Sequence, residues 1–244
     1  MTKRIAIAIA AATALAVPAV AQAELIREFK ITATPGKSST KKKKYPITLK
    51  AVVSQKDTTG ALPPTLTNAT LLLPPGSTWN GDLFPKCAAS KIDSEKSTED
   101  CPEGSVVGKG AVAGGAPGGI VQDDVTIIIA NGGKSTVNMF VEGTSPLRLL
   151  SNIEVKLVKQ TGKFGLRADI PVPEALQEPA PGVPVSITDL SLTLGKSMKI
   201  KGKTRGIIEV TKCTGGKWFG QGKLDFRAPA ESFVADQTLP CKKG

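Results

Sequence analysis

The chain has 244 residues, and its 32 Lys and Arg against 21 Asp and Glu give a formal net charge of +11. It contains no histidine, which excludes Ser-His-Asp and Cys-His catalytic sets and histidine-containing zinc sites. Aromatic residues make up 4% of the chain, which disfavours the aromatic platforms on which many carbohydrate-binding modules stack sugars.

Residues 1–23 have the pattern of a secretory signal peptide. Two basic residues precede an apolar run from Ile5 to Val20, and Ala21-Gln22-Ala23 supplies small side chains for cleavage. We therefore expect a cleavable signal-peptide helix and a mature chain, residues 24–244, that is secreted and works in the extracellular space or at the cell surface. No later apolar run reaches the ~20 residues of a membrane span, so no stable membrane insertion is expected.

A basic segment follows the leader and consists of Lys37, Lys41, Lys42, Lys43 and Lys44. Like charges this close repel each other, which predicts an extended, mobile loop over residues 34–44. In an exported protein such a segment suits an anionic cell-wall polymer, an acidic polysaccharide or anionic lipid. Nucleic acid is not expected, because no nucleic-acid-binding signature accompanies the charge. The alternative, that the charge serves solubility alone, stays open.

Most of the mature chain alternates between apolar and polar residues with a period of two, which is typical of strands with one buried face. The predicted strands cover residues 25–33, 47–54, 70–73, 125–130, 137–141, 153–158, 164–170, 190–194, 207–211 and 218–227. Many short strands separated by Gly and Pro predict an all-β, antiparallel β-sandwich of roughly nine to twelve strands, immunoglobulin-like or jelly-roll-like.

Three stretches lack this alternation. Ala88 to Lys96 and Glu174 to Glu178 are candidates for short helices, and the proline-rich stretch Glu174 to Pro184 reads as an extended connector. Gly108 to Gly119 holds six glycines and reads as a flexible link that divides the chain near residue 118. We prefer one domain over residues 24–244, because the N-terminal part alone offers few strands for a closed core.

Four cysteines in an exported chain are expected to pair. Three connectivities are possible, and the spacing favours Cys87 with Cys101 and Cys213 with Cys241, since both pairs close local segments. A zinc site is disfavoured, because no two cysteines lie two to four residues apart. No metal and no cofactor are expected.

Carboxylate pairs are the remaining candidates for catalysis, because glycosidases need only two acidic residues. Asp123 and Asp124 form the best doublet, but adjacent strand residues point to opposite faces, and a solvated loop is the simpler interpretation. Calcium binding by acidic residues 93–100 is disfavoured, since no run matches a calcium loop. Of the two tryptophans, Trp79 and Trp218, either is a candidate sugar platform, but a lone Trp more often fills a core.

Two blocks surround the cysteines: Leu73-Pro74-Pro75-Gly76 through Gly110, including Phe84-Pro85-Lys86-Cys87, and Lys212 to Cys241. They resemble a group of secreted, β-rich actinobacterial proteins with four cysteines and no assigned activity. The resemblance implies export and local pairing of first with second and third with fourth cysteine. One departure concerns Cys213, which Thr214 follows where relatives often carry Pro.

The sequence thus predicts a non-enzymatic envelope or extracellular protein that binds an anionic wall polymer or another surface ligand. The alternative is a carboxylate-dependent polysaccharide hydrolase, whose two acidic side chains would lie about 5 to 9.5 Å apart in a cleft.

Overall fold

The computed structural model describes residues 24–34, 37–38, 44–211, 213, 215–227 and 229–243. The predicted signal peptide and Lys41 to Lys43 lie outside the described residues. The strands are β1 (Leu25–Thr34), β2 (Lys37–Ser38), β3 (Tyr45–Pro46), β4 (Thr48–Asp57), β5 (Leu66–Leu73), β6 (Ser77–Trp79), β7 (Val106–Ala116), β8 (Ile120–Asn131), β9 (Thr136–Gly143), β10 (Leu149–Lys159), β11 (Leu166–Pro171), β12 (Ser186–Leu194), β13 (Ser197–Ile200), β14 (Lys203–Gly206), β15 (Ile208–Val210), β16 (Lys217–Arg227), β17 (Ala230–Pro240) and β18 (Lys242–Lys243). The helices are η1 (Gly81–Leu83), α1 (Ala89–Glu95) and α2 (Glu174–Gln177).

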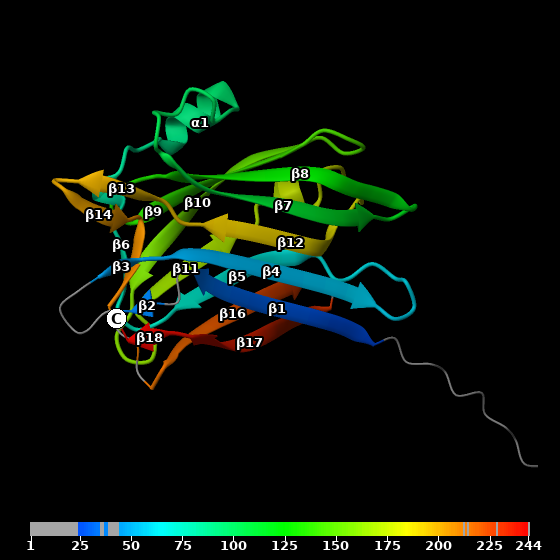
Figure 1. Ribbon diagram of the computed structural model, residues 1–244. Coiled ribbons are helices and arrows are strands. Elements are labelled where there is room, and N and C mark those ends of the chain that lie inside the picture. The colour runs from blue at the N-terminus through cyan, green and yellow to red at the C-terminus, as the bar shows by residue number, and fades with distance from the viewer. Residues whose placement is uncertain are drawn as a thin grey trace, which may run out of the picture.

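Eleven of these strands form one antiparallel sheet in the order β1-β4-β12-β7-β8-β9-β10-β11-β5-β16-β17. The sheet curls until its two edge strands, β1 and β17, lie beside each other, so the molecule is a nearly closed, barrel-like sandwich (Figure 1). The predicted all-β, antiparallel class is confirmed, while the immunoglobulin-like or jelly-roll-like type stays a prediction. Within the described residues, seven shorter strands form three small sheets outside the main one.

Helices α1 and α2 lie within the two stretches predicted as candidates for short helices, whereas η1 was not predicted. Helix α1 and its flanking segment lie on the outer face of the sheet (Figure 1) and bury Ile92 against Phe140 of β9. The Cys87–Cys101 disulfide, with a Cα–Cα distance of 5.3 Å, closes this segment. None of the helices that the described residues form is long and apolar enough to cross a bilayer.

The glycine-rich stretch 108–119 is mostly strand β7, which corrects its interpretation as a flexible link. It pairs with β12 on one side and with β8 on the other, so strands from both sides of residue 118 share one sheet. Its glycines allow close packing: a Cβ on Gly108 would lie 2.4 Å from Thr193 O, and one on Gly114 would lie 2.1 Å from Ser186 O. Sequence reasoning missed β7 because glycine is normally depleted in strands.

The interior of the barrel is filled by the alternate, inward-facing residues of its strands. In β16, every second residue from Trp218 to Phe226 is buried. Trp218 is 1% exposed and packs in the main core cluster, so it fills the core and is not a sugar platform. The Cys213–Cys241 disulfide, with a Cα–Cα distance of 5.9 Å, lies beside this cluster.

Side chains hold the seam between β1 and β17, where no backbone ladder runs. Arg27 of β1 forms an ion pair with Glu231 of β17, and its guanidinium lies 4.5 Å from the ring centroid of Phe226. Gln237 Nε2 donates a hydrogen bond to Phe29 O over 2.8 Å. The Arg27 side chain is only 10% exposed, so solvent screens this contact weakly.

Replacing Arg27 with Met should lower the free energy of unfolding by about 2 kcal/mol, because it leaves Glu231 without its partner and removes the cation–π contact. Urea unfolding at pH 7 measures this change. The matched control is Arg167→Met on β11, where Arg167 and Asp169 form an ion pair that is largely in solvent. That variant should change stability by about 0.5 kcal/mol or less. Equal losses in the two variants would contradict a seam held by Arg27.

Candidate functional site

One end of the barrel collects exposed cations, and we call it the basic end. The strand register brings residues 34 and 48, 49 and 194, 131 and 137, and 159 and 166 to this end. In Figure 1 the same end carries β3, β6, β13, β14 and β18. Its exposed cations are Lys44, Lys134, Lys159, Lys163, Lys199, Lys201, Lys203 and Lys217.

The β13–β14 hairpin contributes the largest share of this charge. Its two turn residues, Lys201 and Gly202, both have positive φ, 48° and 75°, as a type I′ turn requires. Residues 196–205 contain five basic residues and no acidic one. The exposed side chains of Lys199, Lys201 and Lys203 therefore stand on a short, projecting hairpin.

A buried carboxylate anchors the base of this hairpin. Glu209 of β15 is 1% exposed and accepts hydrogen bonds from Arg205 Nε at 2.8 Å and Nη2 at 3.1 Å, and from Gly206 N at 3.1 Å. Burial alone would raise the pKa of Glu209, but these hydrogen bonds outweigh it and lower the pKa below its usual value. The guanidinium of Arg205 is thus occupied by its hydrogen bonds to Glu209, and the main role of Arg205 is to position the hairpin.

An open groove of about 620 Å³ adjoins the hairpin. Trp79, Lys134, Lys159 and Arg205 are among its lining residues. The indole Nε1 of Trp79 donates to Gly133 O over 2.8 Å, which fixes the ring in the wall of the groove. Among the described residues, no carboxylate forms an ion pair with Lys134 or Lys159, so their charges face solvent.

The predicted basic segment begins and ends at this same end of the barrel. Lys37 lies in β2, which pairs with the C-terminal strand β18, and Lys44 is exposed next to β3. Strand β3 in turn packs beside β14. Lys41, Lys42 and Lys43, and the predicted mobility of their loop, lie outside the described residues.

Sequence reasoning missed the lysines of the hairpin and of the groove. The run from Lys196 to Arg205 carries a readable signal, since five basic residues alternate with others and no acidic residue intervenes. Lys134 and Lys159 carry no such signal, because they lie far apart in the sequence, Lys134 in the turn between β8 and β9 and Lys159 at the end of β10. Only the register of β8 with β9 and of β10 with β11 brings them to the same end.

Both predicted disulfides are present, and together they are consistent with an oxidising extracellular compartment. The strand pleat points the two carboxylates of the predicted doublet to opposite faces. Asp123 is exposed, whereas Asp124 accepts hydrogen bonds from the β9–β10 turn. Within the part of the chain that the structure describes, no three Cys, Asp or Glu side chains gather closely enough to hold a metal ion.

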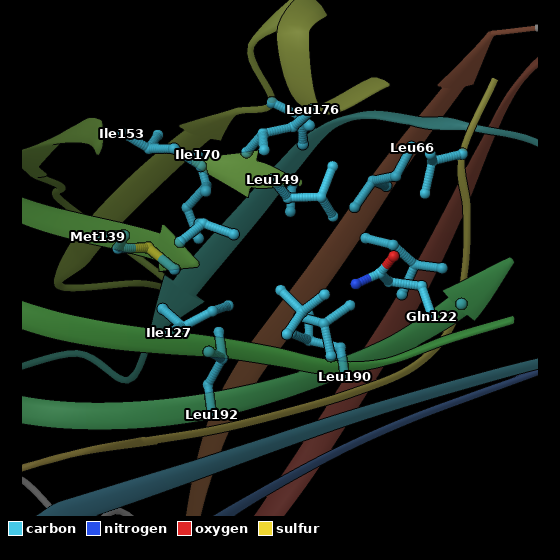
Figure 2. A pocket seen from close by; sticks show the side chains of 18 of the residues that line it. Leu66, Gln122, Ile127, Met139, Leu149, Ile153, Ile170, Leu176, Leu190 and Leu192 are labelled. Carbon is cyan, nitrogen blue, oxygen red and sulfur yellow. The ribbon is translucent and has the colours of Figure 1, made fainter. Parts of the chain in front are cut away.

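A second feature lies inside the barrel, where an apolar cavity of about 100 Å³ separates the facing walls (Figure 2). Side chains from β5 and from β7 to β12 line it, together with residues of the segment 172–185. Leu66, Ile127, Met139, Leu149 and Leu190 are among the side chains that surround it in Figure 2.

Asp124 stabilises the turn between β9 and β10. Its carboxylate accepts hydrogen bonds from Thr144 Oγ1 at 2.6 Å, Thr144 N at 2.8 Å and Ser145 N at 3.0 Å. These bonds, the Thr144 hydroxyl first, lower the pKa of Asp124 to about 2. A carboxyl group with a lowered pKa stabilises the fold above its unfolded-state pKa, and this stabilisation is lost as the pH falls through the folded-state pKa.

Replacing Asp124 with Asn should therefore lower the melting temperature at pH 7, and the difference from the parent should shrink between pH 4 and about pH 2. Melting curves at pH 7, 5, 3 and 2 measure this. The neighbouring Asp123→Asn variant is the control, because that side chain is exposed. A difference that stays constant down to pH 2 would refute the role of the charged carboxylate.

Comparison of this chain with protein-family models, with curated proteins and with solved structures found no match.

Proposed function

We propose that the protein is a secreted, non-enzymatic binding protein of the cell envelope or extracellular space, and that its basic end binds an anionic cell-wall polymer or acidic polysaccharide. The observation that carries the proposal is the concentration, at one end of the barrel, of exposed lysines from five separate segments of the chain. Export and the cell-envelope location rest on the leader pattern and the disulfides.

The arrangement suits a polymer better than a single small anion. The exposed lysines are spread over the hairpin, the groove and the start of β3, so a chain with repeated negative charges contacts several of them at once. Each contact releases counterions and adds a salt-sensitive increment to binding, as for other polyanions. The groove with Lys134, Lys159 and Trp79 gives such a chain a defined path across the end of the barrel.

Positive charge at this end costs little in stability, because the lysines that carry it are exposed and highly hydrated. Glu209, which is buried at this end, is neutralised by Arg205. Removing exposed lysines should consequently weaken polymer binding without unfolding the hairpin.

The test replaces Lys199, Lys201 and Lys203 together with Gln and measures retention on immobilised polyphosphate in a salt gradient. The triple variant should elute at clearly lower salt, and the slope of log affinity against log salt should fall by up to about one unit per lysine removed. The matched control replaces three exposed lysines elsewhere, Lys30, Lys56 and Lys91, with Gln. Both variants lose the same net charge, so equal weakening would reject a dedicated basic end.

A third variant extends the test to the predicted basic segment, with Lys41 to Lys44 replaced by Gln. If this segment and the hairpin contact one polymer, combining the two sets of substitutions should abolish retention at low salt. Isolated anionic cell-wall material then replaces polyphosphate as the matrix. Unchanged retention of the combined variant on that material would reject the proposed partner.

A further inference from the structure

We propose that the groove at the basic end binds the sugar rings of an acidic polysaccharide whose units carry carboxylates, as uronic acids do. Trp79 packs against the C–H face of a sugar ring, while Lys134 and Lys159 pair with carboxylates of the same segment. The inference rests on the proposed binding of an anionic polymer at this end, and it names the chemistry of that polymer.

Backbone hydrogen bonds place the tryptophan and the two lysines around one groove. The indole N–H of Trp79 in β6 donates to Gly133 O over 2.8 Å, and Lys134 is the next residue. The ladder between β9 and β10 continues one residue past the paired strands through a backbone hydrogen bond of 2.8 Å. It therefore brings Lys159, the last residue of β10, beside the same turn. The three side chains come from three segments of the chain and line one surface.

Most other polar side chains of the groove are already engaged within the protein. Thr78, Asn80 and Arg205 donate hydrogen bonds to residues of β14 and β15, which fixes this wall. Asp82 forms an ion pair with Lys86 over 2.8 Å, so its negative charge is offset. Among the lining residues that the structure describes, the charges left for a ligand are therefore those of the two groove lysines.

The carbon surface of the groove selects a sugar ring over a phosphate chain. Leu83, which is 39% exposed, and the half-buried Leu157 line the groove together with Trp79. The indole N–H of Trp79 is already bonded, so the ring presents carbon to the groove. A phosphate chain has no apolar face and would leave this surface in water. A sugar ring has C–H groups on its faces, so it covers the carbon surface while its carboxylate reaches the lysines.

The size and position of the groove suit a short segment of a longer chain. Its volume of about 620 Å³ lies within the ~300–1,000 Å³ of ligand sites, which combine apolar walls with a few polar groups. Ser135, which is exposed and lines the groove, offers a hydroxyl group to the hydroxyls of a sugar. Because the groove is open and adjoins the β13–β14 hairpin, units that flank the bound segment reach the lysines of that hairpin.

The test compares three short ligands by calorimetry at about 0.15 M salt. Tetragalacturonate should bind about tenfold more tightly than its methyl ester, which keeps the sugar rings but loses the charges that pair with the lysines. Tetraphosphate carries at least as much charge but no sugar ring, and it should bind about fivefold more weakly than tetragalacturonate. Equal binding of the acid and its ester, or binding of tetraphosphate at least as tight as that of tetragalacturonate, would overturn the inference.

Two variants test the carbon contact. Trp79→Val removes the ring and keeps a residue that favours strands, so it should weaken tetragalacturonate binding about tenfold and leave tetraphosphate binding unchanged. Leu83→Asn alters an exposed side chain and should weaken tetragalacturonate binding about threefold, which decides the matter even if Trp79→Val does not fold. The control is Val121→Asn, at a residue of β8 that is 67% exposed, and it should change neither ligand. No loss in Leu83→Asn, or equal losses for both ligands, would reject the carbon contact.

A double variant tests the carboxylate contact. Replacing Lys134 and Lys159 with Gln should weaken tetragalacturonate binding about tenfold. The matched control replaces Lys30 and Lys56, which are exposed on β1 and β4, with Gln and loses the same net charge. It should change the affinity about twofold or less. Equal weakening in the two double variants would place the carboxylates elsewhere.

Tryptophan fluorescence reports the site directly. The chain has two tryptophans, and because Trp218 is 1% exposed, quenching by acrylamide reports Trp79. Saturating tetragalacturonate should protect Trp79 from acrylamide, whereas tetraphosphate should not, and unchanged quenching with tetragalacturonate would reject the groove as its site. Polyphosphate retention that depends on the hairpin lysines, together with unchanged quenching, defeats this inference alone. Polyphosphate retention that does not depend on them rejects the proposed function, so the two failures are distinguishable.

Discussion

Closure of one eleven-stranded sheet around an apolar interior is the constraint on which the rest of this structure depends. The edges of an open sheet expose unpaired backbone groups, and here β1 and β17 meet with no ladder between them. Arg27, Glu231 and Gln237 supply the contacts that a ladder would otherwise make. Phe29 packs across the same seam onto Gly222, where a Cβ would lie 2.2 Å from the ring.

Closure also creates two ends with different chemistry. The eleven strands of the main sheet run between the ends, so the loops that join them lie at one end or the other. The basic end carries the lysine hairpin and the groove, which Asp82 also lines, whereas the opposite end carries Glu174, Glu178 and Asp57 together with Arg227. The proposed polymer would therefore contact the first end and leave the second end free.

The interior cavity follows from the same geometry. A sheet of eleven strands encloses a wide interior, and large aliphatic side chains from facing walls fill most of it. Over most of the core the walls are bridged by residues such as Trp218. Between β12 and β10, Leu190 and Leu149 face each other across unfilled space (Figure 2). The side chains of the facing walls leave this small space unfilled.

The sequence by itself determined the all-β class, the two short helices and the pairing of the cysteines, because alternation, helix signals and local spacing are properties of neighbouring residues. It also indicated a basic segment, and the structure then placed both ends of that segment at the basic end. It misassigned β7, since the glycines of that strand are explained only by close packing against β12. Only the tertiary structure decided the strand order, the closure, the grouping of Lys134 and Lys159 with the hairpin, and the cavity. Each of these depends on contacts between residues far apart in the chain, and a period of two marks which face of a strand is buried without specifying its partner.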